Sequence, residues 1–267
     1  MPKYIDIHSH LNLDQFDEDR EEVIQKLKDN NITTITVGDN YLSSKFACDL
    51  SDKHDNLYAC VGLHPSEVLV EEFNYKKILD LALNKKVVAI GECGLDYFRE
   101  NNEEFKLKQK EVFELHIKLA LDIDKPLMIH ARPSKGTMDA YEDVLNILEL
   151  YLKNNSKLKA NFHFFAGDLN IAKRAVGLGF TLSFDGPITF SHDYDEVIKE
   201  IPLESIMTET DSPYAAPVPY RGKRCEPQMV IEVYKTIAKI KGLDEEKVRL
   251  IILENIKRVF GIIDIKY

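Results

Sequence analysis

Two histidines near the start of the chain, His8 and His10, have the spacing of metal ligands at the end of a strand. They stand two positions apart after a short apolar run, and side chains at i and i+2 of a strand point to the same face. Neutral imidazole is a common ligand of Zn²⁺ and similar ions. A surface or hydrogen-bonded structural role would give the same pattern. The pair therefore indicates a metal site only if further ligands come from elsewhere.

Other short β-rich runs also end in side chains that bind metals. These further candidates are Glu92, His130, His163 and Asp211. Six candidates exceed the three protein ligands usual for one catalytic zinc, and a carboxylate can bridge two ions. Mixed imidazole and carboxylate ligands favour Zn²⁺, Mn²⁺ or a similar ion, and Mg²⁺ is a further candidate. We therefore expect two divalent metal ions, although any single residue could instead be a core group satisfied by hydrogen bonds.

A further histidine, His64, follows a predicted strand but would be a seventh ligand. We interpret it as a residue that faces the substrate, where imidazole could contact a phosphate oxygen or protonate a leaving group. A structural loop histidine is the alternative. The remaining histidines His54, His116 and His192 follow no strand, and we interpret them as ordinary surface or helix residues.

The elements that must position these residues alternate between short β-rich runs and longer segments of helical period. We predict strands at 4–8, 32–37, 57–61, 87–91, 126–130, 159–163, 180–184 and 205–208, and helices at 21–30, 75–84, 104–122, 139–153, 169–178, 228–241 and 245–260. This order predicts a single α/β domain over residues 1–267, a (β/α)₈ TIM barrel with extra C-terminal helices. An open doubly wound sheet gives a similar order, but the strand ends of a barrel meet at one mouth, which favours the barrel.

Composition narrows the class of protein. The 267 residues carry a net charge of −10, which argues against a protein that coats duplex nucleic acid through a broad basic surface. Nucleic acid can still be a substrate, because bound divalent ions would dominate the local charge. The four cysteines lack paired spacing, and neither a signal-peptide pattern nor a long apolar run is apparent. We expect a cytoplasmic protein with no membrane association and no obligate protein partner.

Five short motifs together resemble the TatD family of metal-dependent deoxyribonucleases, within the amidohydrolase superfamily. They are DIHSH at 6–10, GLHP at 62–65, GECGLDY at 91–97, ETDSPY at 209–214 and PVPYRGKR at 217–224. The resemblance covers essentially the whole chain. It implies a TIM barrel in which the six candidate residues are ligands and Glu92 bridges two ions. It also implies 3′ to 5′ exonuclease activity on single-stranded DNA ends.

The sequence departs from the family pattern around the expected substrate site. Pro133 stands where relatives often have Asp, Cys225 where they often have Asn, and HFFAG at 163–167 replaces His-Cys-Phe-Ser-Gly. We expect Phe165 and Gly167 to open the helix after the sixth strand, where backbone N–H groups could receive a phosphate.

We expect substrate contacts from two regions. Phe165 could stack on a base, or it could pack in the barrel rim. Arg221, Lys223 and Arg224 form a cationic cluster suited to a phosphate backbone, although charged loops are often only solvated.

These residues suggest a hydrolytic mechanism. Two cations would lower the pKa of a bound water, and the resulting hydroxide would attack phosphorus, with Asp211 as general base and His64 positioning the phosphate. A hydrolase of an amide, an ester or a small phosphoester is the alternative. Many relatives in the superfamily bridge their metals with a carbamylated lysine, and Glu92 at that point favours the nuclease. A non-catalytic binding barrel is a third reading, but it should have lost some ligands.

Overall fold

Eight parallel strands form one sheet that is rolled into a nearly closed barrel. The computed structural model describes residues 2–99, 102–153, 155 and 157–262. The strands are β1 Tyr4–Ser9, β2 Ile32–Val37, β3 Leu57–Val61, β4 Val87–Asp96, β5 Leu127–Arg132, β6 Ala160–Phe162, β7 Thr181–Phe184 and β8 Ile206–Thr208. Each strand pairs with the next in sequence. The two ends of the sheet meet just beyond β8, where Ser9 forms a parallel bridge with Ser212. The predicted barrel is confirmed.

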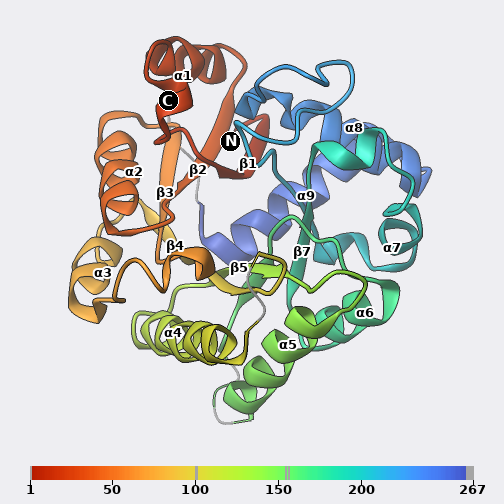
Figure 1. The fold of residues 1–267 in the computed structure, drawn as a ribbon. Helices are drawn as coiled ribbons and strands as arrows, with labels where there is room; N and C mark the ends of the chain where they lie inside the picture. The colour runs from red at the N-terminus through yellow and green to blue at the C-terminus, as the bar shows by residue number, and fades with distance from the viewer. Residues whose placement is uncertain (1, 100–101, 154, 156, 263–267) are drawn as a thin grey trace.

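Helices surround the strands as an outer ring (Figure 1). They are α1 Arg20–Asp29, α2 Tyr41–Lys53, α3 Tyr75–Ala82, α4 Glu103–Asp122, α5 Asp139–Leu152, α6 Leu169–Gly177, α7 Asp195–Glu200, α8 Val230–Lys241 and α9 Glu245–Phe260. Their apolar stripes face the strands: in α8, buried Val230, Val233, Tyr234 and Ile237 recur at the three- and four-residue spacing of one helical face.

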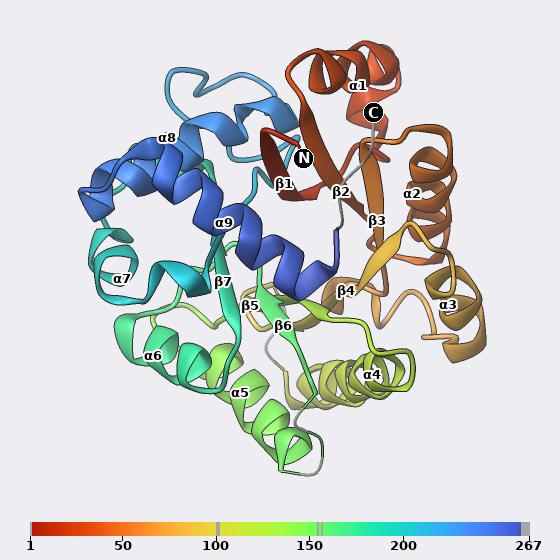
Figure 2. The same ribbon diagram turned by 180° about the vertical axis from the view of Figure 1, so that it is seen from behind.

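The last helix, α9, lies across the N-terminal ends of the strands, as Figure 2 shows. The Arg249 guanidinium donates to the Lys3 carbonyl at 2.8 Å. The Asn255 amide donates to the carbonyls of Leu203 and Ile206, at 2.8 and 2.9 Å, beside the start of β8. The C-terminal ends of the strands, at the opposite side of the barrel, are left for the candidate site. The two predicted C-terminal helices are therefore present, and α9 covers the end of the barrel away from the candidate site.

Strand β4 is longer than the predicted run of 87–91, because its last residues continue beside β5. Two glycines allow this close approach. A Cβ atom on Gly91 would lie 2.5 Å from the Met128 carbonyl oxygen, and one on Gly94 would lie 2.1 Å from that of His130. Both glycines also have positive φ, at 153° and 132°, which L side chains rarely adopt. The motif at 91–97 thus lays Glu92 directly against β5.

Two helices, α2 and α7, were not predicted from the sequence. The first begins after Asn40, whose side chain accepts from the Ser43 backbone N–H at 3.0 Å, while the Ser43 hydroxyl accepts from the Asn40 N–H at 3.0 Å. This reciprocal cap stabilises the first turn. The second helix has only six residues.

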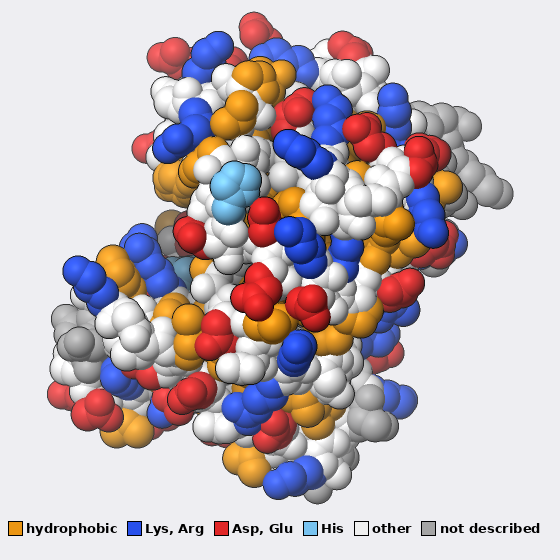
Figure 3. All heavy atoms as spheres, turned by 90° about the vertical axis from the view of Figure 1, so that its right-hand side faces the viewer, with side chains coloured by type: hydrophobic (Ala, Val, Ile, Leu, Met, Phe, Trp, Pro, Cys, Tyr) orange, Lys and Arg blue, Asp and Glu red, His pale blue; other side chains and the backbone are white. Residues whose placement is uncertain are grey.

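On the face shown in Figure 3, positive and negative side chains are mixed: Lys and Arg are interspersed with Asp and Glu. In the described parts of the chain, no helix combines the length and the apolar character needed to cross a membrane.

Candidate metal centre

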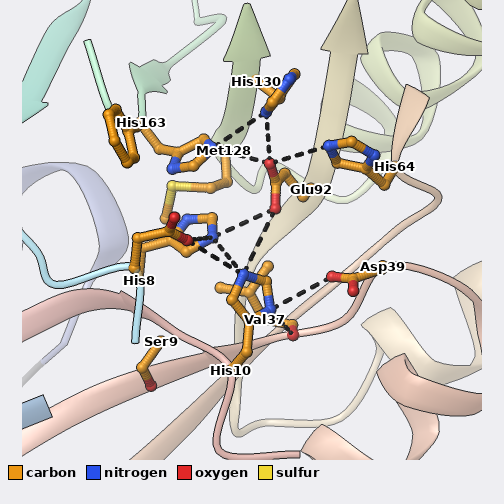
Figure 4. A network of polar contacts seen from close by, with 12 residues as sticks. His8, Ser9, His10, Val37, Asp39, His64, Glu92, Met128, His130 and His163 are labelled. Carbon is orange, nitrogen blue, oxygen red and sulfur yellow. Dashed lines mark hydrogen bonds and ion pairs between the residues drawn. The ribbon is translucent and has the colours of Figure 1, made fainter. Parts of the chain in front are cut away.

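Glu92, near the C-terminal end of β4, lies at the centre of the predicted ligands (Figure 4). It is 4% exposed. Its Oε1 atom lies 2.8 Å from both His130 Nδ1 and His163 Nε2. Its Oε2 atom lies 3.3 Å from His8 Nε2 and 3.9 Å from His10 Nε2. One carboxylate therefore faces two separate pairs of imidazoles.

Asp211, in the segment after β8, completes the group around the first histidine pair. Its Oδ1 atom lies 3.4 Å from His10 Nε2 and 3.7 Å from His8 Nε2. The backbone holds it there, since the Asp211 N–H donates to the His8 carbonyl at 3.0 Å. All six predicted ligands are brought together. The sets His8, His10, Asp211 and Glu92, His130, His163 each place their ligand atoms within 4.8 Å of one another, so the residues present fit a divalent metal centre.

The outer ring nitrogens of two histidines are fixed by acceptors. His10 Nδ1 lies 3.1 Å from the Val37 carbonyl and 3.3 Å from Asp39 Oδ1. His130 Nε2 lies 3.3 Å from Oδ2 of Asp96, a buried carboxylate at the end of β4. A ring that donates its proton outward presents the lone pair of its other nitrogen to the ion. These contacts therefore favour His10 Nε2 and His130 Nδ1 as the ligand atoms.

Glu209 lies behind the cluster and is fully buried. Its Oε2 atom lies 3.2 Å from His163 Nδ1 and 3.7 Å from His8 Nδ1. Its Oε1 atom accepts from the Phe164 N–H at 2.6 Å and from the Ser183 hydroxyl at 2.7 Å. This carboxylate thus stands behind one histidine of each set.

The cluster perturbs its own protonation. Burial alone would raise the pKa of Glu92, but the charges of His163, His64 and His8 lower it well below its ordinary value. Burial would lower the pKa of His10, yet Asp39 and Asp211 raise it to about 10. In the absence of ions, protons held by histidines such as His10 therefore balance the negative charge of the carboxylates. Divalent ions must displace such protons, so metal binding is expected to strengthen as pH rises.

His64 lies beside Glu92 in the 3₁₀ turn after β3, with its Nε2 atom 3.4 Å from Glu92 Oε1. The preceding residue is anchored to α4, because the Leu63 N–H donates to Nε2 of His116 at 3.0 Å. His116 in turn donates from Nδ1 to the Val112 carbonyl at 2.8 Å. The sequence interpretation of His116 as an ordinary helix residue missed this role. Burial lowers its pKa to about 4, so it stays neutral and supports the turn that carries His64.

The cluster opens into a cavity of about 500 Å³. Its wall includes six of the predicted site residues together with arginine and aromatic side chains that the sequence analysis did not assign. Among them are His64, Glu92, Asp211, Arg99, Arg132, Phe164 and Tyr214.

The prediction that Phe165 stacks on a base is wrong. Its side chain is 1% exposed and packs against Tyr141 and Phe184, with ring centroids 5.3 and 6.2 Å away. Its neighbour Phe164 lines the cavity instead. The chain turns at Phe164, which has a φ of +44°, and this turn directs the second aromatic ring into the core.

The phosphate site expected at Phe165 and Gly167 is not formed, because α6 begins later, at Leu169. Its first turn is capped by the Asp168 side chain, which accepts from the Ile171 N–H at 2.9 Å. The Phe165 N–H donates to the Ser183 carbonyl at 3.0 Å. The N–H groups of Phe165 and Ile171 are therefore already used within the protein.

The cationic loop after β8 does not reach the cavity either. Arg224 donates from Nη1 and Nη2 to the two carboxylate oxygens of Asp19, at 2.8 and 2.6 Å. This bidentate contact ties the loop to the segment before α1, so the predicted substrate role of Arg224 is replaced by a structural one. The Arg221 guanidinium lies 3.9 Å from the ring centroid of Phe190. Neither arginine lines the cavity.

Several site residues missed from the sequence carried a readable signal. Arg132 stands two positions after His130, so the period of a strand places both on one face. Asp96 and Glu209 lie within the motifs at 91–97 and 209–214. Asp39 directly follows Gly38 at the end of β2, where a strand-end carboxylate could have been considered.

Comparison with known proteins identifies the family. The sequence profile of the family described as TatD related DNase matches residues 5–261. The chain belongs to the TatD family. A metal-dependent hydrolase of Bacillus subtilis, YabD, is 38% identical over 96% of this chain and 98% of its own length. A metal-dependent hydrolase of Methanocaldococcus jannaschii, MJ1582, is 31% identical over 97% of each chain. Both relatives are named uncharacterized.

The TatD fold is also found among solved structures. The crystal structure of YjjV, a TatD homolog from Escherichia coli, covers 98% of this chain and 99% of its own, with a TM-score of 0.85 and 24% identity. Family and relatives together identify a metal-dependent hydrolase. The clustered ligands of this TatD protein agree with that class.

Proposed function

We propose that this TatD protein is a deoxyribonuclease that removes nucleotides from the 3′ end of single-stranded DNA. The observation that carries the proposal is the position of Arg99 and Arg132 on the wall of the cavity that holds the ligand cluster. Guanidinium groups beside a metal centre suit a phosphodiester, whose charge they can bind. An uncharged amide or ester could accept hydrogen bonds from them but has no negative charge for them to bind.

Different residues of the chain would have different roles at the scissile phosphate. When bound, two divalent ions held by the two ligand sets would supply Lewis-acid activation of water and phosphate oxygen. Asp211 lines the cavity and can accept the proton of the attacking water. The surrounding histidines, above all His10, lower its pKa against the effect of burial, so it is ionised before the reaction.

His64 can donate a hydrogen bond to the substrate. Its Nδ1 atom lies 2.7 Å from the Ser66 hydroxyl and 3.1 Å from the Ser66 backbone nitrogen, so the ring is held on its Nδ1 side and a proton on Nε2 would point toward the cluster. That atom faces Glu92 at 3.4 Å, and the side chain lines the cavity. A phosphate oxygen beside Glu92 would therefore meet a donor, which supports the proposed contact to the phosphate or the leaving group.

The size of the cavity supports action at a strand end. A space of about 500 Å³ is in the range of small-molecule pockets, roughly 300–1,000 Å³. It can hold a terminal nucleotide and its neighbouring phosphates, whereas a duplex would have to remain outside. The four cysteines are buried and free, which supports the further proposal that the protein acts in the reducing cytoplasm.

The test is degradation of single-stranded DNA labelled at its 3′ or 5′ end, with Mg²⁺, Mn²⁺ or Zn²⁺ added to chelator-treated protein. Mononucleotides should appear first from the 3′-labelled strand, and a covalently closed single-stranded circle should resist. Rapid cutting of the circle would contradict end specificity. A panel of amide, ester and small phosphoester substrates on the same preparation tests the alternative hydrolase, which would be favoured if DNA stayed intact.

A further inference from the structure

Arg132 lines the cavity two residues beyond the candidate ligand His130 along β5. It ends β5, two residues after His130, so both side chains point to the same side of the strand. Two residues of strand advance the chain by roughly 6.6 Å. Since both residues line the cavity, the guanidinium lies farther along the wall than the ligand cluster.

The guanidinium of Arg132 is oriented but not neutralised. It lies 4.0 Å from the ring centroid of Phe98, an aromatic side chain that is 52% exposed. Across the described ranges, Arg132 makes no ion pair with a carboxylate. Stacking on an aromatic face fixes the plane of the guanidinium while leaving its N–H groups at the edge free to donate. Such an arginine is prepared for an anion that arrives from solution.

A second cation stands nearby on the same wall. Arg99 has a side chain that is 63% exposed and lies 3.9 Å from Asp96 through its Nε atom. Glu67 also lines the cavity, but its Oε1 atom accepts from the Ser66 hydroxyl at 3.1 Å. The part of the wall formed by Arg99 and Arg132, called here the arginine wall, therefore combines two cations with donors that are available to a ligand.

We propose that the arginine wall binds the phosphate adjacent to the scissile one, on its 5′ side. This inference rests on the proposed function and defines its substrate more closely. Arg132 stands two residues beyond His130 on the same side of β5, so its guanidinium can reach a phosphate next to one held at the ligand cluster. A guanidinium matches a phosphate through two parallel hydrogen bonds. The substrate class is thus an oligonucleotide with a charged internal linkage, in preference to an isolated phosphodiester.

The inference is tested by removing charge from one linkage of the substrate. Two oligonucleotides are compared that differ only in the linkage 5′ to the terminal one, either phosphodiester or uncharged methylphosphonate. For the wild type, kcat/KM for release of the first nucleotide should fall roughly 10- to 100-fold on neutralisation, the effect of one charge-assisted hydrogen-bonding contact. Arg132→Ala should show a similar fall with the ordinary substrate and little further fall with the methylphosphonate.

A matched control comes from the loop that follows β5. Lys135 is exposed and does not line the cavity, so Lys135→Ala removes a charge without touching the arginine wall and should retain wild-type sensitivity to the methylphosphonate. Arg132→Lys keeps the charge but loses the planar fork and should lie between alanine and wild type.

Two outcomes are decisive. If the wild type cleaves both substrates equally, or if Arg132→Ala keeps the full sensitivity, the arginine wall does not bind this phosphate. If the wild type releases no nucleotide from the ordinary substrate, the proposed function fails and this inference fails with it. The first result leaves the nuclease in place, so the two failures are distinguishable.

Discussion

At the scale of single residues, Glu209 is the group whose loss should affect the metal centre without removing a ligand. Its four contacts are donors or ring nitrogens: His163 and His8 at one oxygen, Phe164 and Ser183 at the other. Glu209→Gln replaces one of these acceptor oxygens with a donating amide. At least one contact must then be lost. Because partners behind metal-bound histidines typically change metal affinity about 10- to 100-fold, calorimetric titration should show weaker binding by a similar factor.

The position of Glu209 behind both sets sharpens this prediction. Both metal-binding events should weaken, since one histidine of each set contacts it. Glu67→Gln is the matched control, because Glu67 lines the cavity but contacts Ser66 instead of a histidine. Unchanged metal affinity in Glu209→Gln, with normal folding, would show that the carboxylate has no part in holding the ligands.

Asp211 separates chemistry from folding at the same scale. Its φ is +54°, in a region that Asn tolerates as well as Asp, so Asp211→Asn should keep the backbone. The variant loses the charge needed to accept a proton, and kcat should fall about 10²- to 10⁴-fold under saturating metal. The melting temperature of the chelator-treated protein should change little. A variant with near-native kcat would remove Asp211 from the role of general base.

At the scale of elements, the sequence predicted the strands well because each is an apolar run closed by polar residues. The site followed from that, since ligands at the ends of parallel strands meet at one mouth. Helix α2 was missed because its cap uses Asn40 and Ser43. This pair is a weaker sequence signal than a Ser or Thr followed three residues later by Glu. Whether Phe164 or Phe165 lines the cavity depends on the left-handed backbone of Phe164, whose N–H donates to Glu209. No local sequence pattern reveals this tertiary contact.

The contact between α4 and the turn that carries His64 predicts a pH dependence. His116 is fully buried, and burial lowers its pKa from 6.5 to about 4. Between these values the unfolded chain binds a proton that the folded protein does not, so stability falls as pH drops from 6.5 and levels off below 4. The contribution is about 3 kcal/mol in total.

The variant His116→Gln, which can still accept from Leu63, should remove this component. Urea unfolding of the chelator-treated protein between pH 7 and pH 4 measures it as the difference from wild type. His192→Gln is the control, because that side chain is 90% exposed and should leave the curve unchanged. A wild-type curve that coincides with the His116→Gln curve would contradict the buried neutral imidazole.

At the scale of the whole molecule, the metal centre joins distant parts of the chain. Its ligands come from β1 and the residue just after it, β4, β5, the segment after β6 and the segment after β8. The last of these lies where the barrel meets itself, beside the bridge between Ser9 and Ser212. Ions bound at this point therefore connect the first and last strands with the middle of the sheet, an arrangement that the unfolded chain does not offer.

Metal binding should consequently raise the stability of the entire barrel. An ion that binds only the folded protein adds about 2.7 kcal/mol at a concentration 100 times its dissociation constant. For a chain of this size, that corresponds to a rise of roughly 5–10 °C in melting temperature. The rise should be smaller at pH 6 than at pH 8, because protons compete for the histidines. Melting of chelator-treated protein with increasing Mn²⁺ or Zn²⁺ measures it. Glu92→Gln, which alters the carboxylate that faces histidines of both sets, should lose most of the rise. An equal rise in this variant would place the stabilising ions elsewhere.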